Sequence, residues 1–96
     1  MLIHFLHVSD CQDCEHMLLC LQEAIKESGL DVEVVDHCCD EDDNGNVDET
    51  ALKLAINNGL DDLPACIIGR YTFVGKDNYD YGEILEAIEK TWKQMI

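Results

Sequence analysis

Positive charge is scarce in this sequence. Its 96 residues include only 6 Lys and Arg against 21 Asp and Glu, so the formal net charge is -15 at pH 7. A chain this acidic repels the phosphate backbone of nucleic acids and the headgroups of anionic lipids. We therefore expect no nucleic-acid partner and no binding to a membrane surface.

A basic leader and a long apolar run are also missing. Residues 1–10 contain no Lys or Arg and include His4, His7 and Asp10, so we expect neither a cleavable signal peptide nor a membrane span. The sequence predicts one cytoplasmic domain over residues 1–96, long enough to bury about 65% of the surface that its unfolded chain exposes. In that compartment the 6 cysteines are expected as thiols, catalytic groups or metal ligands, not as structural disulfides.

Hydrophobic periodicity alternates between strand and helix along the chain. Strands are expected at residues 2–8, 32–35, 66–68 and 71–74. Helices are expected at residues 12–28 and 49–57 and from residue 80 onward, where Asp80 and Glu83 form a capping-box pattern. His4 and His7 on the first strand are expected to satisfy buried hydrogen bonds. The order β-α-β-α-β-β-α predicts an α/β fold whose four-stranded mixed sheet is flanked by three helices, with both of its faces covered.

Two thiols stand at the first junction between strand and helix. Cys11-Gln12-Asp13-Cys14 follows the apolar strand and opens the first helix. There, free backbone N–H groups and the positive helix end stabilise a thiolate on the first cysteine. The second falls on the apolar face, so we expect Cys11 to attack and Cys14 to resolve a mixed disulfide. Nearby carboxylates oppose the helix end, which favours a reductase-like or weakly reactive dithiol.

The order of elements, the C-x-x-C motif and Leu63-Pro64 before the third strand together resemble the thioredoxin-like superfamily in its minimal, glutaredoxin-sized form. The resemblance covers essentially the whole chain. It implies a small thiol-disulfide oxidoreductase that uses Cys11 and Cys14 to reduce or exchange protein disulfides, needs no cofactor and is recharged by a reductase or dithiol donor. It also implies a cis peptide bond before Pro64, with Leu63 and Pro64 beside the dithiol to dock the substrate backbone.

The chain departs from the family's patterns in four places. Its motif is neither Trp-Cys-Gly-Pro-Cys nor Cys-Pro-Tyr-Cys, so it assigns no subfamily. Phe5 stands six residues before Cys11, where many thioredoxins carry a buried Asp. Val8 and the segment Gly75-Lys76-Asp77 replace the basic residue and the Gly-Gly-x-Asp pattern of glutathione-using relatives. These replacements argue against glutathione as a substrate.

Further thiols are expected at the same edge of the sheet. If the first two strands are parallel, His37, Cys38 and Cys39 emerge near Cys11, and the third strand brings Cys66 to that edge. One interpretation is a zinc site with Cys11, Cys14 and one or two of His37, Cys38 and Cys39 as ligands. A second makes Cys38 or Cys39 an auxiliary resolving thiol. Free strand-end cysteines are favoured, because the second ligand pair of a zinc signature is missing. A redox-silent interaction module on the same fold remains a further alternative.

An acidic loop insertion is expected at about residues 36–47. Within it, the stretch that begins at Asp40 matches the first nine positions of an EF-hand-like calcium loop. Ala51 stands at position twelve, where a bidentate Glu should close the coordination shell. A solvated acidic loop is therefore favoured and no metal is assigned. The weaker alternative ligands are Asp40, Asp42, Asn44 and Asp48.

Overall fold

The computed structural model describes residues 1–41, 43–60, 62–75 and 80–95. In that part of the chain four strands and three helices follow one another in the predicted order. The strands are β1 (Leu2–His7), β2 (Glu33–Cys38), β3 (Ala65–Ile68) and β4 (Tyr71–Val74). The helices are α1 (Gln12–Ser28), α2 (Glu49–Asn57) and α3 (Tyr81–Met95).

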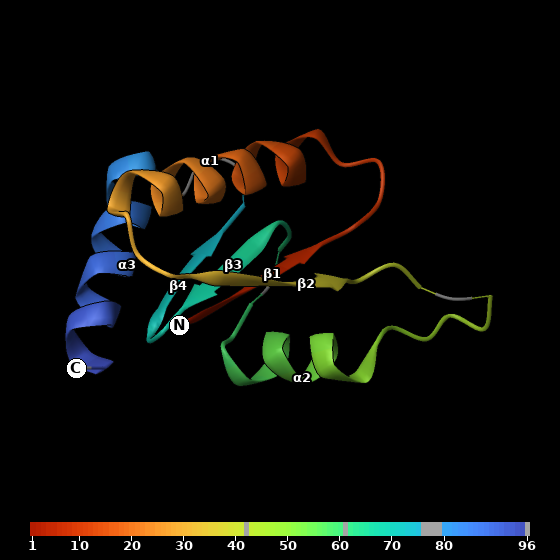
Figure 1. Cartoon of the computed structure of the whole chain (residues 1–96). Helices are drawn as coiled ribbons and strands as arrows, with labels where there is room; N and C mark the ends of the chain where they lie inside the picture. The colour runs from red at the N-terminus through yellow and green to blue at the C-terminus, as the bar shows by residue number, and fades with distance from the viewer. Residues whose placement is uncertain (42, 61, 76–79, 96) are drawn as a thin grey trace.

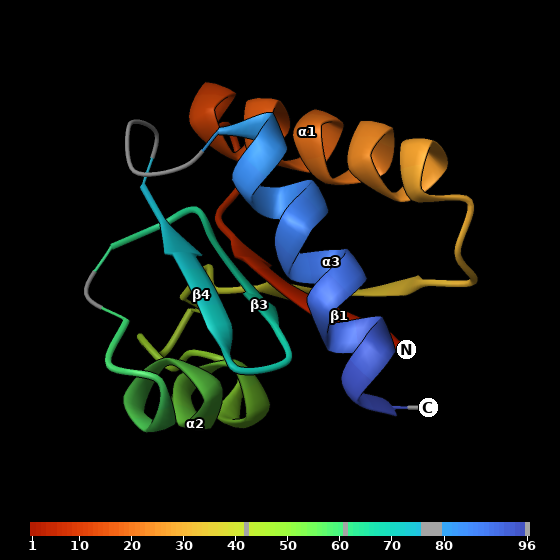
Figure 2. The ribbon, with the colours of Figure 1, turned by 90° about the vertical axis from the view of Figure 1, so that its left-hand side faces the viewer.

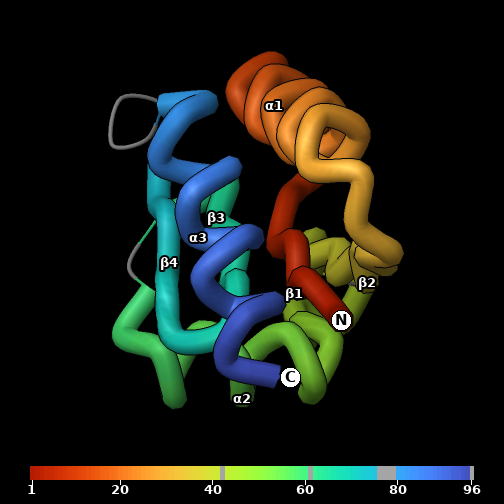
Figure 3. The backbone as a smooth tube through the Cα atoms, turned by 60° about the vertical axis from the view of Figure 1, so that its left-hand side comes forward, coloured from red at the N-terminus to blue at the C-terminus, as the bar shows by residue number. Residues whose placement is uncertain are grey.

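The strands form one mixed sheet in the order β2-β1-β3-β4, which Figure 3 shows with β1 between β2 and β3. β1 runs parallel to β2 and antiparallel to β3, and β3 pairs with β4 in a hairpin. Near the end of β1, Leu6 pairs with His37 on one side and Ala65 on the other. The ends of β1 and β2 and the start of β3 therefore meet at one edge, called here the site edge.

Helices cover both faces of this sheet, as predicted. Figures 1 and 2 show α1 and α3 together over one face and α2 alone over the other. Alternate residues of β1 serve the two layers, because Ile3 and Phe5 belong to the core under α1 and α3 whereas Leu6 belongs to the smaller core beside α2. Full burial of an aliphatic side chain of this size contributes about 1.5–3 kcal/mol. The helix ends that hold the site are thus anchored to a packed sheet.

The second strand is longer than predicted, which corrects the expected start of the acidic insertion. Pairing with β1 continues to the last position, where His7 lies opposite Cys38, so the loop begins at Cys39 and not near residue 36. Two polar side chains fit in this stretch because β2 is an edge strand. Asp36 remains exposed, and His37 is covered but bonds to His4, with 2.9 Å between His4 Nδ1 and His37 Nε2. The expected hydrogen bond of His4 is present, and it is partly buried.

Local signals explain where the helices begin and end. α1 stops at Gly29, which adopts a left-handed conformation (φ 67°) that favours glycine and donates its N–H to the carbonyl of Lys26. The predicted cap of α3 is present, because Asp80 Oδ1 accepts a hydrogen bond from the Glu83 N–H at 2.8 Å. Among the described residues, none of the helices has the length and apolar character that crossing a membrane requires.

Candidate dithiol site

Cys11 and Cys14 lie at the start of α1, at the site edge. Cys11 is the N-cap residue, with an extended backbone, and its Sγ accepts a hydrogen bond from the Cys14 N–H at 3.0 Å. The two cysteines are joined by a disulfide, and their Cα atoms are 5.2 Å apart. Asp10 makes the turn into the helix with a left-handed φ of 53°, a conformation that Asp tolerates better than most residues. The turn and the cap together hold Cys11 at the helix N-terminus.

The two sulfurs differ in accessibility, as the sequence predicts. Cys14 is only 4% exposed and belongs to the core under α1, whereas Cys11 is partly exposed at the edge of that core. The backbone N–H that points at Cys11 Sγ also stabilises a negative charge on that atom once the disulfide is opened. Cys11 Sγ is thus the sulfur that lies at the surface, and Cys14 Sγ is the one enclosed by the core.

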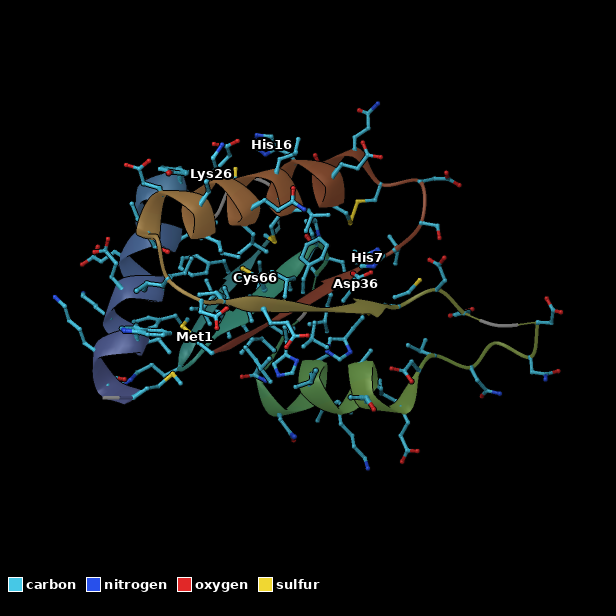
Figure 4. The ribbon with its side chains drawn as sticks, in the orientation of Figure 1. Met1, His7, His16, Lys26, Asp36 and Cys66 are labelled. Atoms are coloured by element: carbon cyan, nitrogen blue, oxygen red, sulfur yellow. A yellow bond between two sulfur atoms is a disulfide. The ribbon has the colours of Figure 1, made fainter. Side chains whose placement is uncertain are left out.

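A pocket of about 250 Å³ lies beside the disulfide and contains two titratable groups that sequence reasoning did not assign to the site. His7 of β1 and Asp36 of β2 line it together with both cysteines. The buried His7 Nε2 lies 2.6 Å from Asp36 Oδ1, an ion-pair distance without the angles of a hydrogen bond. Figure 4 shows the two side chains close together beneath the start of α1.

The expectation that His7 satisfies a buried hydrogen bond is therefore wrong. Its ring stacks on Phe5, with centroids 5.3 Å apart, and faces the carboxylate of the neighbouring strand. The register explains the meeting: Phe5 pairs with Asp36, and side chains two residues apart share a face. The local sequence pattern does not reveal this register, because it predicts that the strand ends at residue 35 and that Asp36 belongs to the loop.

The peptide bond between Leu63 and Pro64 is cis, as predicted. Pro64 is buried at the site edge just before β3, and its carbonyl accepts a hydrogen bond from the Gly75 N–H at 2.8 Å. Leu63 is partly exposed. A role for Leu63 and Pro64 in binding substrate stays a prediction. Of the segment compared with glutathione-using relatives, Lys76 and Asp77 lie outside the described residues.

Solved structures share this fold. Thioredoxin 1 from the thermophilic eubacterium Thermosipho africanus TCF52B superimposes with a TM-score of 0.55 at 20% identity, over 99% of this chain and 98% of that chain. This chain has a thioredoxin-like fold. A structure described as a malarial protein gives the same TM-score of 0.55 at 12% identity, over 94% of each chain. No protein-family model and no curated protein matches the sequence.

Within this thioredoxin-like fold the other cysteines do not gather around the dithiol, contrary to the expected cluster. Cys38 and Cys39 are neighbours at a strand end and diverge: Cys38 is exposed, and Cys39 lines a separate pocket beside α2. Cys66 shares the core of Cys14 but is buried, and burial raises the pKa of its thiol to about 12. It therefore stays protonated at neutral pH. In the part of the chain that the structure describes, no three His, Cys, Asp or Glu side chains form a group able to hold a metal ion.

The acidic loop, residues 39–48, uses two of its candidate calcium ligands for structure. Asp40 accepts hydrogen bonds from the Ser9 hydroxyl and from the Ser9 N–H, the latter at 2.9 Å, and these two bonds lower the pKa of Asp40. Asp48 caps α2 by accepting from the Ala51 N–H at 3.3 Å. Asp42 lies outside the described residues. The loop is thus tied at one end to the turn before Cys11 and at the other to α2.

Proposed function

We propose that this protein is a small thiol-disulfide oxidoreductase that reduces or exchanges disulfides in protein substrates through Cys11 and Cys14. The observation that carries the proposal is the unequal pair at the start of α1. One sulfur is partly exposed and receives a backbone N–H, and the other is 4% exposed in the core beneath it. The thioredoxin-like fold supports redox chemistry of this general kind.

The reaction proceeds in two exchanges. The Cys11 thiolate attacks one sulfur of the substrate disulfide, forms a mixed disulfide and expels the other substrate sulfur as a thiolate, which takes up a proton. Cys14 then loses its proton and attacks Cys11 Sγ, which expels the second substrate thiolate and forms the Cys11–Cys14 disulfide seen here. Two electrons pass from the protein to the substrate. A reductase or dithiol donor returns them.

The proton of Cys14 needs an acceptor in a mostly closed site. Phe5 stands where the resemblance leads us to expect a buried Asp, so that position supplies none. His7 lines the same pocket as Cys14, and imidazole is the side chain that exchanges protons between about pH 5 and 8. In this proposal His7 takes the proton of Cys14, and Asp36 Oδ1, 2.6 Å from Nε2, stabilises the imidazolium that forms.

The substrate backbone docks at the site edge against Leu63 and Pro64. These residues precede β3, whose first residue, Ala65, pairs with Leu6 near the end of β1. The partners in this proposal are disulfide-bearing proteins and a dithiol donor in the cytoplasm, and glutathione is not the expected donor. The cysteines outside the dithiol are free thiols in the structure, which fits a reducing compartment.

Reduction of insulin disulfides by single-cysteine variants tests the proposal. Cys11→Ser should abolish turnover and mixed-disulfide formation, whereas Cys14→Ser should accumulate a mixed disulfide detectable by mass spectrometry. Cys38→Ser is the matched control, because it removes an exposed thiol outside the pocket, and it should retain turnover. No turnover by the unchanged protein would favour a redox-silent interaction module, and full activity in Cys11→Ser would show that this dithiol does not carry the reaction.

A further inference from the structure

Apart from the ion pair between His7 and Asp36, the charged side chains described beside the dithiol are acidic. Asp13 and Glu15 lie in the first turn of α1, and Asp10 and Asp36 line the pocket with the two sulfurs. No Lys or Arg lines this pocket within the described residues. Lys26 is in the last turn of α1, and Figure 4 shows it at the end of the helix away from His7 and Asp36. An approaching substrate therefore meets a negative field.

Two of the other basic side chains are paired with carboxylates on α2 and α3. Lys53 lies 3.3 Å from Glu49 on α2, and Lys90 lies 2.7 Å from Glu86 on α3. Exposed pairs of this kind contribute little to stability, but they remove positive charge from the surroundings. With a formal net charge of -15, the molecule as a whole adds to the negative field of the carboxylates at the site edge.

An apolar groove adjoins the same edge on the opposite face of the sheet. It has a volume of about 440 Å³ and lies between α2 and the sheet. Leu63, the residue before cis-Pro64, lines it together with Ala51, Leu52 and Leu60. Leu52 is 49% exposed, so this apolar surface is open to solvent. A chain docked along Leu63 and Pro64 passes the mouth of the groove.

We propose that the substrate is a cationic polypeptide that places an apolar side chain in this groove while its disulfide reaches Cys11. The inference rests on the proposed function and names its substrate class. Complementary charge raises the rate of encounter, and burial of an apolar side chain contributes affinity and register. A second copy of the chain is the less favourable occupant, because it would bring a further formal charge of -15 against the first.

Disulfide-linked peptides of matched length test the charge preference. One carries Lys residues and a Leu near its cysteine, a second carries Glu in place of Lys, and a third keeps Lys but has Ser in place of Leu. At low ionic strength kcat/KM for the Lys peptide should exceed that for the Glu peptide by about tenfold or more, and salt should bring the two values together. Equal values for the two peptides at low ionic strength would overturn the inference.

Two double variants locate the charges responsible. Asp13→Asn/Glu15→Gln should lower the Lys-to-Glu preference at least about twofold. Glu27→Gln/Glu33→Gln removes the same charge from exposed residues away from the pocket and should leave the preference nearly unchanged. The ratio of the two substrates cancels any change in the intrinsic reactivity of the thiol. Equal effects of the two variants would show a preference set by net charge alone and would contradict the assignment to this edge.

The groove is tested by two substitutions on one helix. Leu52→Ser should raise KM for the Lys peptide that carries Leu, and should have little effect on the peptide with Ser. Ile56→Ser is the matched control, because Ile56 is 70% exposed on the same helix and does not line the groove. If Leu52→Ser instead shifts a monomer–dimer equilibrium and leaves peptide kinetics unchanged, the groove binds a second copy and the inference is wrong.

A small neutral disulfide, bis(2-hydroxyethyl) disulfide, separates this inference from the proposed function. If the protein reduces it through Cys11 but shows no charge or Leu52 effect with the peptides, the oxidoreductase proposal stands and the substrate class is refuted. If neither the neutral disulfide nor any peptide is reduced, both proposals fail.

Discussion

Reduction of the Cys11–Cys14 disulfide should destabilise the folded protein by about 1–2 kcal/mol. The bond joins residues with a sequence separation of 3, and for so short a loop the chain-entropy model gives about 2 kcal/mol of stabilisation. The reduced protein regains part of this lost stability, because a thiolate at a helix N-terminus is stabilised by about 0.3–1 kcal/mol. The carboxylates of Asp13 and Glu15, in the same turn, oppose that gain. The disulfide contribution is therefore the larger.

This difference in stability also shifts the reduction potential of the dithiol. By the thermodynamic cycle, a folded state that favours the disulfide makes its dithiol a stronger reductant than the same dithiol in the unfolded chain, by about 30 mV for each 1.4 kcal/mol. The expected 1–2 kcal/mol thus corresponds to roughly 20–40 mV of added reducing power. A value of this sign fits a protein that delivers electrons to substrates.

Urea unfolding of the oxidised and dithiothreitol-reduced protein measures the difference directly, with Trp92 fluorescence and far-UV circular dichroism as probes. The double variant Cys11→Ser/Cys14→Ser is the control, and its unfolding should not respond to the reductant. If the reduced protein is at least as stable as the oxidised protein, stabilisation of the thiolate offsets or exceeds the entropic stabilisation that the disulfide provides. Folding would then add no reducing power to the dithiol, and this reasoning would be refuted.

Two further predictions concern stability. Burial, and then the His37 ring, lower the pKa of His4 below its ordinary value of 6.5, so the unfolded chain binds the proton first as the pH falls. The contribution of neutral His4 to folding stability is therefore complete above about pH 6.5 and is lost as the pH falls below it. His4→Gln should flatten the fall in unfolding free energy between about pH 7.5 and 5. An unchanged slope would contradict this prediction. Gly69→Ala should cost at least about 2 kcal/mol in chemical denaturation, because Gly69 has a φ of 59° and an added Cβ would lie 2.7 Å from the Thr91 side chain. Gly59→Ala, at a φ of 64° with open space around it, should cost only about 1 kcal/mol, and equal losses would remove the argument from contact with Thr91.

The element order and the fold class were predictable because periodicity is a local property of the sequence. The apolar stripe of α1, the Gly29 stop and the Asp80 cap each depend on residues a few positions apart. The cis bond at Pro64 was predictable from a different source, the resemblance to the thioredoxin-like superfamily, and not from any local preference of proline.

The contents of the pocket were not predictable because they depend on register. From the sequence alone, Asp36 is predicted to begin an acidic loop. In the structure it is part of β2 and pairs with Phe5 of β1. Once the strand extends, the alternation of side chains brings Asp36 to His7 and separates Cys38 from Cys39. A difference of a few residues in one strand therefore removed the expected thiol cluster and added a titratable pair beside the dithiol.

The acidic loop has a structural function that its composition conceals. Asp40 holds Ser9, two residues before Cys11, through both the hydroxyl and the backbone N–H, and Asp48 caps α2, which supplies one wall of the apolar groove. One connection thus links the turn that presents the dithiol to the helix that lines the groove. Charged hydrogen bonds to a backbone N–H are among the stronger ones, so loss of Asp40 should loosen the turn before Cys11 more than loss of an unbonded loop carboxylate would. In the part of the chain that the structure describes, the loop has no group of side chains able to hold a metal ion. Its carboxylates Asp40 and Asp48 instead connect the two faces of the site edge.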